Sequence, residues 1–225
     1  MIQFTLTAIF LLAMMGWRPV MGAEPGDRIK LPPHLSKGVM TVEEALEKRR
    51  SRRSYGDAPL MLEDVAQILW AAQGITHRRG GMRTAPSAGA LYPLEIYLIS
   101  GDVEGLTAGI YHNQPVGHKL ILLKDGDLRD KLTWAVLFQN WIQGAPAIIV
   151  ISAVYERTEE KYESMAKRYV HMEAGHVSQN IYLQATSRNL ATVFVGAFGD
   201  KQLQKILSLP RDHIPIGIMP LGKHK

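Results

Sequence analysis

The chain has no cysteine among its 225 residues. This absence excludes disulfide bonds, cysteine-ligated zinc, iron–sulfur clusters and thiol catalysis together. It leaves the redox compartment open, because a chain without thiols is compatible with either environment. Hydrophobic residues are plentiful, at 46%, so a chain of this length can bury a sizeable core within one domain.

Several nucleotide-binding and catalytic motifs are also missing. No G-x-G-x-x-G opens a helix and no G-x-x-x-x-G-K-[ST] occurs, so a dinucleotide fold and a P-loop lack support. No nucleophile elbow surrounds a serine, which disfavours a hydrolase. The stretch "HMEAGH" is not a metal motif, because His171 and His176 are five residues apart and would project about 140° apart on a helix. The sequence therefore predicts no metal site.

The positive charge of the chain is modest and clustered. Its formal net charge is +5, without a basic tail. The densest clusters are residues 48–53 and the group Arg78, Arg79 and Arg83. A short cluster at a helix end suits one phosphate better than a nucleic-acid track, so we expect an anionic small ligand and no nucleic-acid partner. A solvated surface run is the alternative interpretation.

The first 23 residues form a separate segment. Residues 2–15 are mostly apolar but short for a membrane span, and small residues follow at Gly22 and Ala23, where a signal peptidase could cut. No Lys or Arg precedes the apolar run. We expect residues 1–23 to be a signal peptide that directs export to the periplasm. An uncleaved membrane anchor and a cytoplasmic location are the alternatives.

The rest of the chain is predicted to be a linker over residues 24–40 and one domain over residues 41–225. Thr41 and Glu44 form a capping box that starts a helix. Periodicity and composition predict helices over about 41–50, 62–73, 128–138, 159–189 with a break near 167, and 201–207, and strands over 94–99, 109–112, 119–123, 147–154, 192–195 and 214–219. Several strands follow one another without helices between them, so the predicted fold class is α+β rather than doubly wound.

Three parts of the sequence together predict a mononucleotide with a large ring. Guanidinium and hydroxyl groups that bind phosphate follow the first helix, at Arg49, Arg50, Ser51 and Arg53. Small residues that leave a flat ring unobstructed lie at Pro86, Ser87, Ala88, Gly89 and Ala90. Near the end of the domain, Gly196 follows a predicted strand, and Lys223 and Lys225 offer further positive charge.

The same stretches carry a family resemblance. "RRSRRSYGDAPL", "APSAGALYPLEIY", "EAGHVSQNIYLQATSRNLATVFVGAF" and "IMPLGK" resemble the nitroreductase superfamily of FMN enzymes. Within it, the sequence is most similar to the SagB-type dehydrogenases, which include the azoline oxidases of peptide natural-product pathways. The resemblance extends from about residue 41 to residue 222.

The resemblance implies a mixed central sheet flanked by helices, in a homodimer with FMN at the interface. Arg49, Arg50, Ser51 and Arg53 would hold the phosphate, the ribityl chain and the pyrimidine edge, with Lys223 as a further phosphate contact. Pro86, Ser87, Ala88 and Gly89 would line the isoalloxazine from the second subunit, and Val195 and Gly196 would lie at its N5 side.

A Lys–Tyr pair in "RTEEKYESMAKRY" is the candidate catalytic site. Azoline oxidases of this branch carry such a pair at a similar place, where it is implicated in proton removal. A lysine in apolar surroundings favours its neutral form and can act as a base, so Lys161 and Tyr162 are the predicted catalytic residues. A solvated helix surface remains open, because glutamates flank the pair.

Two classes of function therefore remain. One is an FMN oxidoreductase acting on a small molecule or a modified peptide, either SagB-like or an NAD(P)H-driven nitro or quinone reductase. The other is a flavin-binding or complex-partner protein without turnover. Reversible bleaching of a yellow protein separates them.

Overall fold

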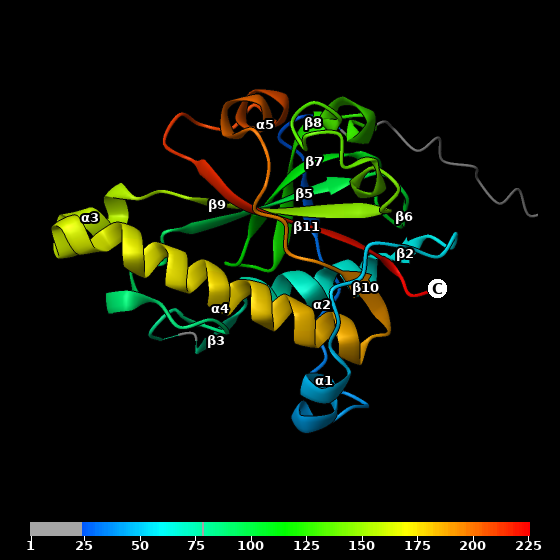
Figure 1. Ribbon diagram of the computed structural model, residues 1–225. Coiled ribbons are helices and arrows are strands. Elements are labelled where there is room, and N and C mark those ends of the chain that lie inside the picture. Colours follow the sequence, from blue (N-terminus) through cyan, green and yellow to red (C-terminus); the bar gives the residue numbers. More distant parts are fainter. Residues whose placement is uncertain (1–23, 78) are drawn as a thin grey trace, which may run out of the picture.

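A computed structural model describes residues 24–77 and 79–225, and its largest element is a seven-stranded sheet (Figure 1). The strands lie in the order β1-β8-β7-β5-β9-β11-β10. Their bounds are β1 Arg28–Lys30, β8 Lys119–Asp125, β7 Gly109–Gln114, β5 Leu94–Ser100, β9 Ala147–Ala153, β11 Ile214–Lys223 and β10 Leu190–Thr192. Within the described residues, neighbouring strands of this sheet run antiparallel.

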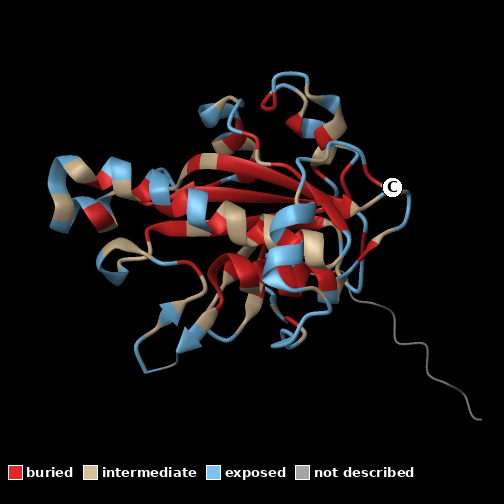
Figure 2. Ribbon diagram, turned by 60° about the horizontal axis from the view of Figure 1, so that its bottom comes forward, coloured by how far each residue is buried: buried red, intermediate tan, exposed pale blue. Residues whose placement is uncertain are grey.

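Strand β9 shows why the sequence at the centre of the sheet is almost entirely apolar, with Ser152 as its one polar residue. All of its residues are buried. Successive side chains point to opposite faces, so Ile149 and Ile151 enter one core while Ile148 and Val150 enter the other. A strand covered on both faces has no position where a polar side chain reaches water. Figure 2 shows the resulting buried centre of the sheet.

Helices cover the two faces unequally. The helices α2 (Leu62–Gln73) and α4 (Ala166–Ser187) pack against each other on one face, and α5 (Asp200–Leu207) lies on the other (Figure 1). The 3-10 turns η2 (Arg129–Leu132) and η3 (Asn140–Ile142) join α5 on that second face. The site described below lies on the α2–α4 side.

The remaining elements are short. They are α1 (Val42–Lys48), α3 (Glu156–Tyr162), η1 (Ala88–Ala90), η4 (Glu163–Met165), the parallel strand pair β2 (Leu60–Met61) and β6 (Val103–Glu104), and the antiparallel pair β3 (Ile75–His77) and β4 (Met82–Arg83). Both halves of the predicted capping box are present at Thr41 and Glu44. Helix α2 has the predicted bounds, 62–73. Strand pairs of both senses with flanking helices confirm the α+β prediction.

Some predicted bounds need correction. Residues 24–40 are not only a linker, because β1 pairs with β8 and Leu31 is buried in the core. The predicted helix over 128–138 is instead the turn η2 and a loop, since Leu137 and Phe138 adopt left-handed φ values of 52° and 60° that a helix cannot contain. The break in the long helix falls at η4 rather than near Lys167, and the strand predicted over 192–195 is β10, two residues earlier.

The predicted export segment, residues 1–23, lies outside the described residues. Within the described residues, no helix combines the length and apolar character needed to cross a membrane. The same part of the chain holds no group of three or more His, Asp or Glu residues placed to bind a metal ion.

Candidate active site

The largest described cavity is a groove of about 1000 Å³ beside α4. Its walls come from α3, from the first half of α4, from the segment after β10 and from the start of β11. Two of its lining residues are glycines that border open space. A Cβ added to Gly175 would meet no atom within 4 Å, and one added to Gly196 would meet only Phe194, at 3.8 Å. The groove is therefore open where these glycines line it.

Tyr182 links this groove to the basic segment after α1. Its hydroxyl accepts a hydrogen bond from the Phe194 backbone N–H (2.7 Å) and lies 3.2 Å from Ser51 Oγ. The Arg49 guanidinium lies over its ring, 5.1 Å from the centroid. Gly175, Ser178 and Tyr182 share one face of α4 and span about 10 Å at helical rise. We call the path from Gly196 along α4 to Arg49 the track. Tyr182, Ser51 and Arg49 lie beyond the lining of the groove and are connected to it through Phe194.

The four residues predicted to bind phosphate do not lie together. Arg49 and Ser51 meet Tyr182, whereas Arg50 lines a separate basic pocket of about 310 Å³ with Lys48, Arg52 and His224. Neighbouring side chains of this non-helical segment thus alternate between two sides. The prediction of one common grip is corrected to two groups, of which the Arg49 group lies on the track.

Arg53 belongs to neither group. Its guanidinium lies over the Trp141 ring, 5.7 Å from the centroid. Two hydrogen bonds tie the loop before Trp141 to the residues after Gly196: Gln139 Nε2 donates to Ala197 O (2.8 Å), and Gly199 N donates to Ala135 O (2.7 Å). Arg53 therefore contacts the loop that supports the residues just beyond Gly196.

Lys223 is held by a buried carboxylate. Its Nζ lies 2.5 Å from Asp64 Oδ2, and Arg188 contacts the other oxygen at 2.6 Å. Burial alone would raise the pKa of Asp64, but hydrogen bonds from Lys223 and Arg188 and their charges hold it below its usual value. An ammonium has three donors, so a phosphate contact for Lys223 stays a prediction, with Asp64 as its present partner.

Val195 and Gly196 lie in different surroundings. Val195 is buried in the core and exchanges both backbone hydrogen bonds with Ile218, each at 2.9 Å. The next residue, Gly196, is exposed and lines the groove. Val195 therefore anchors the backbone, and Gly196 presents it.

The predicted platform lies against the predicted catalytic pair. A Cβ on Gly89 would come within 3.0 Å of both Lys161 Nζ and Tyr162 Oη. The loop is unusual, since Gly89, Ala90 and Tyr92 all have left-handed φ values, of 63°, 55° and 48°. Lys161 is exposed, so the described part of its own chain does not supply the apolar surroundings that a lysine base needs.

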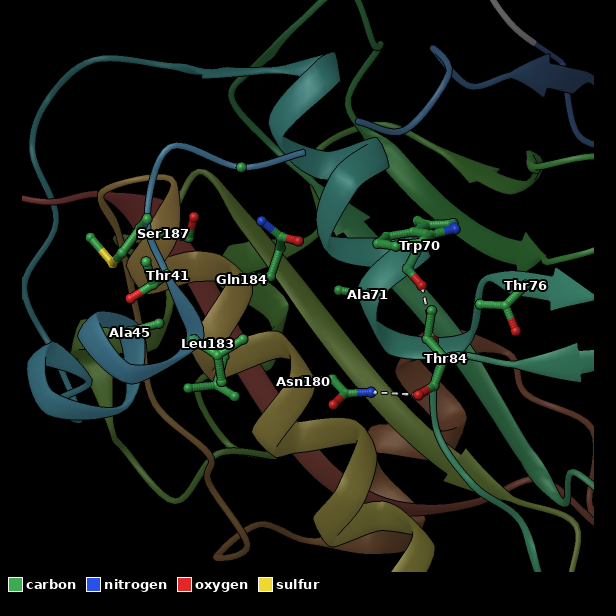
Figure 3. A pocket seen from close by; sticks show the side chains of 13 residues that line it. Thr41, Ala45, Trp70, Ala71, Thr76, Thr84, Asn180, Leu183, Gln184 and Ser187 are labelled. Atoms are coloured by element: carbon green, nitrogen blue, oxygen red, sulfur yellow. Dashed lines mark hydrogen bonds between the residues drawn. The ribbon is translucent and has the colours of Figure 1, made fainter. Parts of the chain in front are cut away.

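Side chains hold the start of this loop against α4. Figure 3 shows Asn180 Nδ2 donating to Thr84 O (3.2 Å), beside a pocket of about 430 Å³ between α1, α2 and α4. Thr84 Oγ1 donates to Trp70 O (3.1 Å) in the same view. None of the predicted site residues lines that pocket.

The candidate residues thus form two sets within one chain. The groove set contains Gly196, which lines the groove, and Arg49, Ser51 and Tyr182, which are connected to it through Phe194. The loop set contains Pro86–Gly89 with Lys161 and Tyr162, and its members do not line the groove. Sequence reasoning missed Tyr182, although its spacing from Gly175 and Ser178 on a predicted helix was a usable signal.

Comparisons with known proteins identify the family of the chain. The nitroreductase family matches residues 46–223. A candidate nitroreductase from Methanocaldococcus jannaschii is 46% identical over 182 residues, covering 81% of this chain and 90% of that protein. The crystal structure of a candidate nitroreductase from Ralstonia eutropha JMP134 shares 30% identity and a TM-score of 0.78, covering 92% of this chain and 98% of that one.

A more distant likeness concerns the fold alone. A chain of the Escherichia coli microcin synthetase complex, solved with truncated pro-MccB17 bound, shares 20% identity and a TM-score of 0.68, covering 99% of this chain and 85% of that one. The family match over most of the chain, together with the M. jannaschii relative, carries the assignment. The chain belongs to the nitroreductase family, whose members are oxidoreductases.

Proposed function

We propose that the protein is an FMN-dependent oxidoreductase that binds the flavin along α4. The observation that carries the proposal is the track from Gly196, past Ser178 and Tyr182, to Ser51 and Arg49. The groove volume lies at the upper end of the roughly 300–1000 Å³ found for small-ligand sites. Open glycines at one end suit a flat ring, and a guanidinium and a hydroxyl at the other suit a phosphate. The residues present fit FMN.

Each set of residues would have a separate task. Arg49 and Ser51 would hold the phosphate and ribityl end, Arg53 the pyrimidine edge, and Gly196 the ring at its N5 side. When bound, FMN supplies a centre that accepts or gives two electrons as a hydride at N5. In the oxidative direction, Lys161 Nζ or Tyr162 Oη would take the proton that the substrate loses together with its hydride.

The separation of the two sets supports a homodimer. Within one chain, Gly89 faces Lys161 and Tyr162 rather than the groove. A second copy would place its loop set over the groove of the first, which completes the site and withdraws Lys161 from water. Mixing two inactive variants, Arg49→Ala and Gly89→Val, tests this arrangement. Mixed dimers with one intact site should regain part of the activity, whereas failure to regain any would count against a shared site.

The direction of electron flow has two candidate forms. The placement of Lys161 and Tyr162 at Gly89 favours a SagB-type dehydrogenase. The relative named as a nitroreductase in M. jannaschii favours the other candidate, a reductase of nitro compounds, for which NAD(P)H would be the electron donor. Anaerobic mixing of the purified yellow protein with NADPH separates them, since rapid bleaching supports the reductase. Bleaching by an azoline substrate instead supports the dehydrogenase. A colourless protein that ignores added FMN supports a partner protein without turnover.

The N-terminal segment bears on the same choice. An exported enzyme would lie outside the cytoplasmic NAD(P)H pool and would need a quinol, oxygen or its own substrate as redox partner. A fusion of residues 1–30 to a reporter active only outside the cytoplasm tests the export proposal. Export combined with rapid NADPH reduction would break the link between location and electron donor.

A further inference from the structure

Helix α4 carries a carboxyl group that the groove does not use. Glu173 is 3% exposed, and it lies against Ser87 of the loop, Gln73 of α2 and Arg83 of β4. Within the described residues, Glu173 Oε1 and Gln73 Nε2 are both buried without a hydrogen-bond partner. An unpaired acceptor and an unpaired donor in one polar cluster require an explanation, because buried polar groups are rarely left unpaired. A small rotation of either side chain would pair them.

The charge around this carboxyl offsets the effect of its burial only in part. Arg83 is the cation that acts on Glu173 within the described chain, and it is already shared. Arg83 Nη1 donates to Gln73 Oε1 (2.8 Å). The Arg83 guanidinium also interacts electrostatically with Glu95 and Arg157. Burial raises the pKa of Glu173, and Ser87, Gln73 and Arg83 offset that rise only in part. The side chain therefore retains its proton above the usual range of a glutamate.

The loop above Glu173 needs such support. Ser87 Oγ accepts a hydrogen bond from Tyr92 N (2.9 Å), which leaves the hydroxyl hydrogen of Ser87 free for another partner. Between these two residues, Gly89 and Ala90 are left-handed, as is Tyr92 itself. Such backbone persists only where the surroundings determine it strongly. Glu173 lies next to Ser87, where a hydrogen bond to the Ser87 hydroxyl can hold this left-handed backbone in place.

We propose that Glu173 is a positioning residue: its buried carboxyl group accepts hydrogen bonds from Ser87 Oγ and Gln73 Nε2 and thereby holds the loop in the conformation that sets Gly89 against Lys161 and Tyr162. The catalytic meaning of this inference rests on the proposed function, but the hold on the loop does not. Burial disfavours the ionised carboxyl, and Ser87, Gln73 and Arg83 compensate only in part, so the contribution of Glu173 to stability should fall as the pH rises.

Hydrogen exchange of the full-length protein, followed on peptides that cover residues 83–92, tests the hold. Protection factors are compared because intrinsic exchange varies with pH. Glu173→Gln keeps the shape and the neutral state, so it should preserve protection. Glu173→Ala should lose protection roughly tenfold or more, because Gln73 and Ser87 lose their partner. The exposed Glu104, changed to Gln, is the matched control and should change nothing.

The pH dependence of the melting temperature separates an effect of the ionisation of Glu173 from an effect of its packing. A carboxyl whose folded pKa is raised stabilises fully below its unfolded pKa and loses that contribution as the pH rises through the folded value. Wild-type protein and Glu173→Gln should therefore melt together near pH 4 and diverge as the pH rises, with the variant melting higher. Protection of residues 83–92 should fall with pH in wild type only.

Two outcomes would overturn the inference. One is full loop protection in Glu173→Ala. The other is a difference in melting temperature between wild type and Glu173→Gln that does not vary with pH. If Glu173→Ala does not fold, the Gln comparison alone decides. A protein that binds no FMN but shows the predicted loop and pH behaviour would remove the proposed function and leave the role of Glu173 standing.

Discussion

The groove along α4 and the loop at residues 83–92 would contact the same ligand, but they are built differently. The groove is lined by a 22-residue helix and by the start of a ten-residue strand, with Tyr182 bridging to Phe194. The loop has little regular structure, and a few side chains hold its left-handed residues. Regular elements spread a local change over many backbone hydrogen bonds. Single substitutions should therefore matter more in the loop than in the groove.

The largest expected effect is that of Gly89→Val. A valine there must adopt a φ of 63° and bring its Cβ within 3.0 Å of Lys161 Nζ and Tyr162 Oη. Left-handed backbone alone costs a non-glycine residue about 1–3 kcal/mol, and the contact adds to this cost. We expect the variant to fold but to purify with little flavin, as measured by flavin absorbance per chain.

A matched glycine separates the two causes. Gly81 has nearly the same φ, 62°, but a Cβ there would meet no atom within 4 Å. Gly81→Val should keep its flavin. Equal flavin content in wild type and Gly89→Val would show that the loop does not approach the ring.

Glu95→Gln should destabilise the loop side of the molecule in a pH-dependent way. Burial alone would raise the pKa of Glu95, but hydrogen bonds from His112 and Arg157 and their charges lower it to about 2. Arg157 also donates to Tyr92 O (3.1 Å), so the pair reaches the loop. A depressed pKa means that the stabilisation is present above about pH 4.5 and is lost as the pH falls through 2.

Urea denaturation at several pH values measures this effect. At neutral pH the loss should be at most roughly 3 kcal/mol, and it should shrink in acid. Glu104→Gln is the exposed control. A loss that is equal at pH 7 and at low pH would show that Glu95 acts by packing rather than by charge.

Substitutions of Arg49, Arg50 and Arg53 test which of these arginines contributes to FMN affinity. Arg49→Ala and Arg53→Ala should each weaken FMN binding by about 1.5–3 kcal/mol, because each removes a charge-assisted contact. Arg50→Ala should have a smaller effect, since Arg50 lines the separate basic pocket. Titration calorimetry with FMN gives the three affinities, and an equal loss in Arg50→Ala would place the phosphate in that pocket instead.

The smallest expected effect is that of Tyr182→Phe. It removes the acceptor of the Phe194 N–H and the neighbour of Ser51 Oγ but keeps the ring under Arg49. We expect a loss of about 1 kcal/mol in FMN affinity, because the regular elements keep the groove in place. Tyr169→Phe, whose hydroxyl has no hydrogen bond to another described residue, is the control. A loss as large as that of Gly89→Val would remove the contrast between the two regions.

Sequence patterns predicted the elements that short-range physics determines. The capping box at Thr41, the bounds of α2 and the strand β9 were all predicted, because each depends on neighbours in the chain. The helix expected over 128–138 was wrong, because the backbone turns left-handed at Leu137 and Phe138, which the spacing of apolar residues does not show.

The site residues were harder to predict for a related reason. Nothing in the sequence shows that Lys223 meets Asp64, 159 residues away. The four-residue basic grip was predicted as one unit because the sequence does not give the backbone direction after α1, which sends Arg49 and Arg50 to different sides. The sequence did point to Glu173. A glutamate between the buried Val170 and Val177 on one helix face must either pair with another group or be protonated.

Helix α4 fixes the spacing between the two regions of the site. Glu173 lies under the loop, Gly175 and Ser178 line the groove, and Tyr182 follows on the same face of the helix. Because all four residues belong to one helix, that helix sets the angle and the distance between the two regions. One residue inserted after Gly175 would turn Tyr182 by about 100° away from Ser51. Seven inserted residues would restore its direction to within about 20° and lengthen the groove by about 10 Å. If FMN binds along α4 as proposed, the helical repeat of α4 would set the length of ligand that the site can hold.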